Sequence, residues 1–155
     1  MPLLSGGGQE EGRRAGTPAL PLICAFACAA EIVQKQVQQE SERLAKLQKL
    51  LEKGLKQVCP SLFIYGEKTQ RLPNTTLFSI PEKDAQTLQI FLDLAGFSVS
   101  TGAACSSGKL QKSSVLKAMQ GEGAHTALRV STGLSTTVEV IDAFLAALRD
   151  YCDKN

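Results

Sequence analysis

The sequence lacks tryptophan, and it contains only two tyrosines and a single histidine among its 155 residues. Acidic and basic residues nearly balance at a formal net charge of +2, and no run of basic residues is interleaved with aromatic ones. A nucleic-acid-binding surface usually needs clustered positive charge together with stacking side chains, so the composition argues against a nucleic-acid partner. We also find no internal repeat and no low-complexity segment.

Closely spaced cysteine pairs of the CxxC type are missing as well. The five cysteines are odd in number, and with 43% hydrophobic residues the chain is large enough to bury one ordinary core without disulfide staples. This pattern favours the reducing environment of the cytoplasm. Cys24 and Cys28 lie one helical turn apart, but no second ligand pair accompanies them, so we expect core thiols and no metal.

A long apolar run is also lacking. Arg13-Arg14 followed by the apolar residues 19–30 has the layout of a twin-arginine export signal. The run is too short to span a bilayer, and it continues into a helical pattern without a cleavage site and polar break. We therefore interpret it as the start of a buried helix, and we expect a soluble, cytoplasmic protein with no membrane partner.

The spacing of apolar residues predicts one long helix from about Pro18 to Val58, with Thr17 as its N-cap. Beyond it the pattern changes to short segments bounded by proline, asparagine and glycine. The pattern predicts strands at 62–65, 75–80, 97–100 and 127–131, and helices at about 83–95, 113–119 and 137–151. Interleaved strands and helices of this kind indicate the α/β class, here a small α/β sandwich with a largely antiparallel sheet.

Two residues are candidates for chemistry. Cys105 lies in Thr101-Gly-Ala-Ala-Cys-Ser-Ser-Gly108, among residues too small to bury its thiol. Arg129 lies in a short β-branched run, where a rigidly held guanidinium can bind a carboxylate through two hydrogen bonds. Together they suggest amino-acid chemistry, although each residue alone is compatible with an incidental thiol or a surface ion pair. His125 could suggest a Cys-His hydrolase, but no orienting Asn or Asp is marked, and a solvated loop histidine is simpler.

Four motifs in sequence order resemble those of pyridoxal-phosphate-dependent cysteine desulfurases, members of the class V aminotransferase family of fold type I. They are Gly6-Gly-Gly-Gln-Glu10 with Gly12-Arg-Arg-Ala-Gly-Thr17, Arg71-Leu-Pro-Asn-Thr75, Ser100-Thr-Gly-Ala-Ala-Cys-Ser-Ser-Gly108, and Leu128-Arg-Val-Ser-Thr-Gly133 with Ser135-Thr-Thr137. The resemblance covers essentially the whole chain and corresponds to the C-terminal part of such an enzyme. It implies that residues 1–17 are the tail of the large cofactor-binding domain, 18–58 the linking helix, and 59–155 the small domain with the cysteine loop.

The resemblance also implies roles for individual residues. Cys105 would attack the sulfur of L-cysteine and become a persulfide while L-alanine leaves, which requires thiolate character. Arg129 would bind the substrate carboxylate, and Thr17 would bind the phosphate of pyridoxal phosphate belonging to the other subunit of a homodimer. The long, small-residue loop around Cys105 resembles the type that passes sulfur to an iron–sulfur scaffold protein or another acceptor.

One departure from the family bears on activity. Relatives hold the cofactor through a lysine in a His-Lys context upstream of the glycine-rich motif, and here Met1 stands only five residues before Gly6. We therefore expect this lysine to be missing, together with the ring-stacking residue and the aspartate that pairs with the pyridine nitrogen, and we expect the chain to be inactive alone. The alternatives are a non-enzymatic thiol relay or desulfurase-binding domain, and a degenerate gene fragment whose apolar N-terminal helix mediates self-association.

Overall fold

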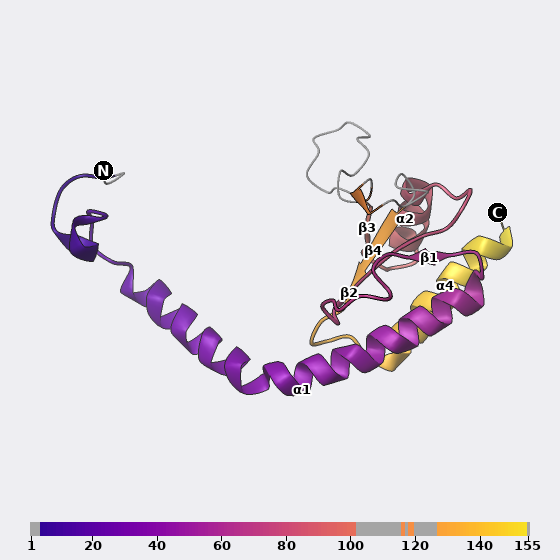
Figure 1. The fold of residues 1–155 in the computed structure, drawn as a ribbon, viewed down its shortest axis with the longest axis horizontal. Helices are drawn as coiled ribbons and strands as arrows, with labels where there is room; N and C mark the ends of the chain where they lie inside the picture. Colours follow the sequence, from indigo (N-terminus) through magenta and orange to yellow (C-terminus); the bar gives the residue numbers. More distant parts are fainter. Residues whose placement is uncertain (1–3, 102–115, 117, 120–126, 155) are drawn as a thin grey trace. The chain divides into compact units, whose positions relative to one another are not determined.

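The structure is a computed structural model that describes residues 4–101, 116, 118–119 and 127–154 (Figure 1). The chain divides into two compact units, Met1–Gln38 and Gln39–Asn155. The first unit contains the 3-10 turn η1 (Gln9–Gly12) and the first part of the helix α1 (Leu20–Val58). The second unit contains the rest of α1 and all the described strands, so it holds the α/β architecture that the sequence predicts.

A tight backbone segment precedes α1 in the first unit. Glu10 and Glu11 have φ values of 53° and 56°, in the left-handed region that non-glycine residues rarely adopt. The segment is closed by a hydrogen bond of 3.2 Å from the Ala15 N–H to the Leu4 carbonyl, and Arg14 Nη1 donates to the Gly16 carbonyl at 2.8 Å. Backbone polar groups of the glycine-rich motif are thus bonded within the motif itself.

The helix α1 begins at Leu20, two residues later than the sequence predicts. The N–H groups of Leu22 and Ile23 both donate to the Ala19 carbonyl, at 3.0 and 3.1 Å, so Ala19 rather than Thr17 stands at the helix start. Pro21 is tolerated in this first turn because its missing N–H would have no helical partner there. The prediction that Thr17 caps α1 is therefore wrong.

The apolar start of α1 is exposed rather than buried. Leu20, Leu22, Ile23 and Phe26 are between 50% and 77% exposed, because no described residue of the first unit covers them. Among the described residues, α1 is the one helix long and apolar enough to cross a membrane by length and composition, with an 18-residue window of mean hydropathy 1.3 that is 0% buried. The predicted burial of this segment is wrong, and the apolar stretch of α1 is longer than residues 19–30 suggested.

The described strands of the second unit form one sheet in the order β1-β2-β4-β3, with every neighbouring pair antiparallel (Figure 1). They are β1 (Phe63–Ile64), β2 (Thr75–Ser79), β3 (Ser100–Thr101) and β4 (Ala127–Ser131). The α/β class and the antiparallel sheet are thus confirmed. The strand predicted at 97–100 starts only at Ser100, because the Phe97 N–H donates to the Leu92 carbonyl at 2.8 Å and so ends the preceding helix.

Three helices contribute to the main core of the second unit: α1 from Gln39 onward, α2 (Ala85–Leu94) and α4 (Val138–Lys154). Its centre consists of side chains at most 1% exposed, which are Leu51, Leu55, Phe78, Leu92, Leu128 and Leu148. The predicted helix at 83–95 begins slightly later, because Asp84 is the N-cap and accepts a hydrogen bond of 2.8 Å from the Thr87 N–H. The helix predicted at 113–119 falls largely outside the described residues, although Leu116 is described and buried.

Candidate functional site

Arg129 lies on the face of the sheet opposite the main core. Along β4, Leu128 and Val130 are buried in that core, whereas Arg129 and Ser131 are exposed, as strand alternation requires. We call the face that carries Arg129 the outer face. Apolar contacts on the core side thus hold β4 in place, and the Arg129 guanidinium on the outer face stays accessible.

The backbone around Arg129 is held by strands on both sides. In the register of the sheet, Arg129 is opposite Leu77 of β2 and Ser100 of β3. A small second cluster of buried residues, Tyr65, Leu116 and Ala127, includes the residue two before Arg129 on the same strand. Because β4 is paired with a strand on each side, the backbone of Arg129 is held in one position. A residue that binds a carboxylate needs such a fixed position.

No carboxylate in the described part of the chain forms an ion pair with Arg129. This contrasts with Arg43 and Arg71, whose guanidinium groups pair with Glu40 and Glu52 at 2.6 and 2.5 Å. The described residues therefore give no support to the alternative in which Arg129 forms a surface ion pair. Its donors remain available for a carboxylate from outside these residues.

Cys105 lies outside the described residues, as does His125. The strand that leads toward Cys105 is described: β3 ends at Thr101, which pairs with Leu128, the neighbour of Arg129. Cys105 follows four positions after Thr101 in the sequence.

Thr17 lies in the first unit, and Arg129 lies in the second. The Thr17 side chain is exposed, and no hydrogen bond joins its hydroxyl to another described residue. At the start of α1, the N–H groups of Leu20, Leu22 and Ile23 are already bonded to nearby carbonyls, and Pro21 has none. The helix start therefore offers little to a phosphate beyond the Thr17 hydroxyl itself.

The burial of the described lysines bears on whether one of them could bind pyridoxal phosphate. A lysine that forms a Schiff base is normally desolvated so that its amine can be neutral. Among the described residues every lysine is exposed except Lys83, which is half-buried. Together with the occupied N–H groups at the start of α1, this means that the described residues do not by themselves form a pyridoxal phosphate site.

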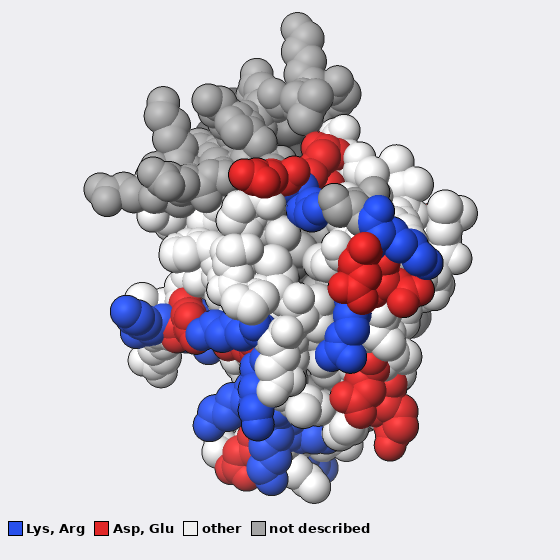
Figure 2. All heavy atoms as spheres, turned by 90° about the vertical axis from the view of Figure 1, so that its right-hand side faces the viewer, with Lys and Arg blue, Asp and Glu red and all other residues white. Residues whose placement is uncertain are grey.

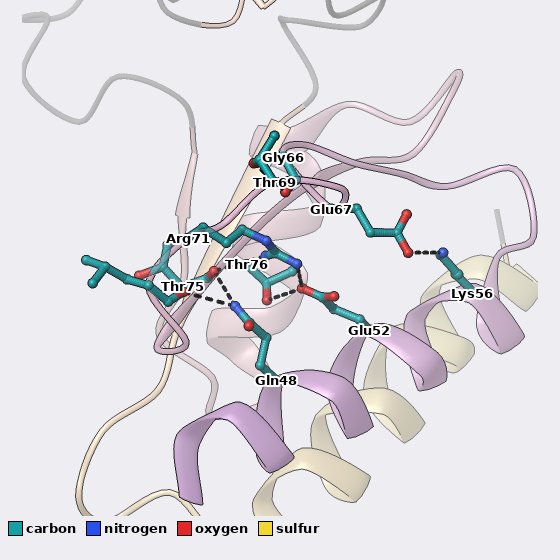
Figure 3. A network of polar contacts seen from close by, with 10 residues as sticks. Gln48, Glu52, Lys56, Gly66, Glu67, Thr69, Arg71, Thr75 and Thr76 are labelled. Carbon is teal, nitrogen blue, oxygen red and sulfur yellow. Dashed lines mark hydrogen bonds and ion pairs between the residues drawn. The ribbon is translucent and has the colours of Figure 1, made fainter. Parts of the chain in front are cut away.

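A polar network holds the start of β2, and the sequence did not reveal its role (Figure 3). Glu52 Oε1 of α1 accepts hydrogen bonds from Arg71 Nη2 at 2.5 Å and from the Thr76 hydroxyl at 3.1 Å. Gln48 of the same helix donates to the Thr75 carbonyl at 2.9 Å. The motif Arg71–Thr75 thus fastens β2 to α1, and β2 is the neighbour of the strand that carries Arg129.

A second arginine secures the turn that follows β4. Arg43 of α1 donates to the carbonyls of Thr136 at 2.6 Å and Gly133 at 2.9 Å, while Glu40 accepts from its guanidinium. The hydrogen bonds between the two side chains lower the pKa of Glu40 and raise that of Arg43, because they favour the charged form of each. The sequence signal for this arrangement is the Glu-x-x-Arg spacing of residues 40 and 43. The spacing predicts the ion pair, but it does not predict which carbonyls accept hydrogen bonds from Arg43.

On the described part of one face, charges of both signs lie close together. Figure 2 shows acidic and basic side chains interspersed over the face that it presents. A shallow groove of about 320 Å³ is lined by lysines and glutamates together, namely Lys49, Glu52, Lys53, Lys56 and Glu67. The described residues contain no group of three or more His, Cys, Asp or Glu side chains that could hold a metal ion.

Comparisons with known proteins place this fold. A family model described as "Aminotransferase class-V" matches residues 5–144. The chain is 34% identical to a cysteine desulfurase of Gluconacetobacter diazotrophicus over 96% of its own length, and 37% identical over 91% to cysteine desulfurase NifS of Azotobacter vinelandii. A NifS-like protein of Rickettsia africae has a crystal structure similar to 99% of this chain, with a TM-score of 0.81 at 35% identity. In each case the chain spans only part of the relative, 40%, 36% and 40% respectively.

Proposed function

The chain belongs to the aminotransferase class-V family, and on this basis we propose that it is the C-terminal part of a cysteine desulfurase. Residues 1–17 then correspond to the tail of the large domain, 18–58 to the linking helix and 59–155 to the small domain. The observation that carries the proposal is Arg129, which is exposed and unpaired among the described residues, next to the strand that leads to Cys105.

In this proposal the two residues act on one substrate, L-cysteine. Arg129 binds the carboxylate through its guanidinium and so orients the thiol group of the substrate. The Cys105 sulfur forms a bond with the substrate sulfur, and the bond between that sulfur and carbon breaks. The carbon keeps the electron pair and takes up a proton, so that L-alanine leaves and Cys105 carries a persulfide. The persulfide sulfur then passes to an acceptor, which we propose to be an iron–sulfur scaffold protein.

Pyridoxal phosphate is the cofactor that the family implies, and Thr17 is the residue proposed to contact its phosphate. Because the described residues do not form a complete site, we propose that the lysine comes from a large domain or from a partner subunit that carries it. The homodimer expected for the family would provide such a subunit. We propose the cytoplasm as its location, because the cysteine pattern favours a reducing compartment.

The test measures sulfide release from L-cysteine, with pyridoxal phosphate and a thiol reductant present. The chain is assayed alone and together with a cysteine desulfurase whose own nucleophilic cysteine has been replaced by alanine. We expect release only in the mixture, and we expect Cys105→Ala to abolish it, with Cys24→Ala as the matched control. Release that is unchanged in Cys105→Ala would refute the assignment of Cys105.

Arg129 is tested in the same mixture. A hydrogen-bonded contact to a charged group contributes about 1.5–3 kcal/mol, so Arg129→Gln should lower kcat/KM for L-cysteine by roughly 10- to 150-fold. Arg149 of α4 is also exposed, and Arg149→Gln serves as the matched control with the same loss of charge. Equal effects of the two substitutions would mean that Arg129 does not bind substrate.

The exposed state of the described lysines favours a second candidate, a thiol domain that relays sulfur without a cofactor. In that case the chain acquires one sulfur atom on Cys105 when it is incubated with an active desulfurase and L-cysteine, and mass spectrometry detects it. The two candidate functions differ in the visible absorption expected of the chain. A chain that holds pyridoxal phosphate covalently keeps visible absorption through gel filtration, and a thiol relay does not.

A further inference from the structure

Cys59 and Cys152 lie outside the proposed site, at the ends of two neighbouring helices. Cys59 follows the last residue of α1, and its N–H still donates to the Leu55 carbonyl at 2.9 Å. Cys152 lies in the last turn of α4. Within the second unit the two helices end on the same side, as Figure 1 shows.

Two contacts, one to the turn just before α4 and one within α4, show that α1 and α4 run in the same direction. Arg43 bonds to the carbonyl of Thr136, 93 residues later. About three turns along α1, Gly54 contacts Leu145, and the absence of a side chain on Gly54 lets the helices approach closely there. Counted from the Gly54–Leu145 contact at equal rise, Cys59 is level with Asp150, two residues before Cys152, so both thiols lie at the same end of the helix pair.

Burial and electrostatics agree with this placement. Both thiols are free and half-buried, and both pack against the main core cluster. Burial raises the pKa of Cys152, and the negative charge of a Cys59 thiolate raises it further, with Asp153 acting in the same direction and Lys83 in the opposite one. This agrees with the position of the two residues at the same end of α1 and α4.

We propose that Cys59 and Cys152 form a redox-active thiol pair, which an oxidant of the peroxide or azo class closes to a disulfide. With the azo compound diamide, the two thiols lose two protons and two electrons, the N=N bond takes them up to become a hydrazine, and a sulfur–sulfur bond forms. Because Cys59 lies beyond the last residue of α1, it can adjust to the short Cβ–Cβ separation that a disulfide needs. The bond fastens the end of α4 to the end of α1 and leaves Cys105 free.

The test treats the full chain with diamide at low protein concentration and blocks the remaining thiols by alkylation. Peptides from the monomer are then identified without reduction by mass spectrometry. We expect the link between Cys59 and Cys152 to dominate, and we expect links from Cys152 to Cys24 or Cys28 to be at least tenfold rarer. The last two cysteines are the built-in control, because both are exposed and lie in the first unit.

A second readout needs no variant of the paired cysteines. The disulfide constrains the unfolded chain over a long loop, so the oxidised monomer should unfold at a higher temperature than the reduced one, and a reductant should reverse the shift. Links that form at random among all cysteines, links found only between molecules, or no oxidation at all would each overturn the proposal.

Discussion

Gly54 of α1 lies against Leu145 of α4, and its substitution by alanine tests how tightly the core is packed there. A Cβ on Gly54 would lie 2.2 Å from Cδ1, 3.0 Å from Cδ2 and 3.1 Å from Cγ of Leu145. Carbon atoms are in optimal contact at about 3.5–4.0 Å, so the leucine end must move by more than about 1 Å. Because Cγ is also too close, rotation about χ2 alone does not relieve the clash, and χ1 or the helices must shift.

Two opposing contributions set the change in the free energy of unfolding that Gly54→Ala causes. Replacing glycine by alanine inside a helix stabilises by about 1 kcal/mol, because alanine loses less backbone entropy. Overpacking a core costs about 1–3 kcal/mol. We therefore expect Gly54→Ala to destabilise the chain by about 1 kcal/mol. In a Leu145→Ala background the clashing atoms are gone, and the same substitution should stabilise by about 1 kcal/mol, which amounts to a coupling of about 2 kcal/mol.

The assay is urea unfolding followed by circular dichroism, for the original chain, the two single variants and the double variant. Lys53→Gly is the matched control for helix propensity, because Lys53 is exposed on α1 and should cost about 1 kcal/mol in both backgrounds. If Gly54→Ala has the same sign in both backgrounds, the steric contact with Leu145 does not determine its effect and the reasoning fails.

Three further predictions concern the polar network, the turn after β4 and the apolar part of α1. Glu52→Ala should destabilise by roughly 2–3 kcal/mol in urea unfolding, because the Arg71 and Glu52 side chains are only 21% and 13% exposed. Glu67→Ala should change stability by less than about 1 kcal/mol, because its pair with Lys56 is far more exposed, and equal effects would contradict this argument. The lowered pKa of Glu40 in the folded state means that its pair with Arg43 contributes stability above the pKa of the unfolded chain and loses it as the pH falls through the folded value. Thermal unfolding between pH 7 and 3 should therefore show a smaller acid-induced decrease in Arg43→Gln than in the original chain, and parallel curves would count against it. Finally, Phe26 is 77% exposed, and Phe26→Ser should reduce self-association in analytical ultracentrifugation. Phe63→Ser, at a 53% exposed position in the second unit, is the control that should not.

Local signals were sufficient for most elements of the second unit. The apolar period predicted the long helix, and the structure moved its start by only two residues. The local pattern predicted β4 at the residues observed, and the structure then shows Arg129 exposed between the buried Leu128 and Val130. These features depend on residues that are near one another in sequence, so a single chain reveals them.

Two local predictions about the start of α1 were wrong. Thr17 was assigned as a cap and residues 19–30 as a buried helix, yet Ala19 starts α1 and its first apolar residues are exposed. An apolar pattern shows that a face could be buried, but whether anything covers it depends on other parts of the structure. The described residues of the first unit provide no such cover.

The sequence by itself determined the family, the order of helices and strands, and the residue types that indicate sulfur chemistry, because these follow from short motifs and from periodicity. Only the tertiary structure decided which residues meet across long separations. It placed Leu77 and Ser100 beside Arg129, joined Arg71 to Glu52, and brought Gly54 of α1 against Leu145 of α4. Strand register and the alignment of two helices depend on how distant side chains pack together, and no local pattern in the chain records that choice.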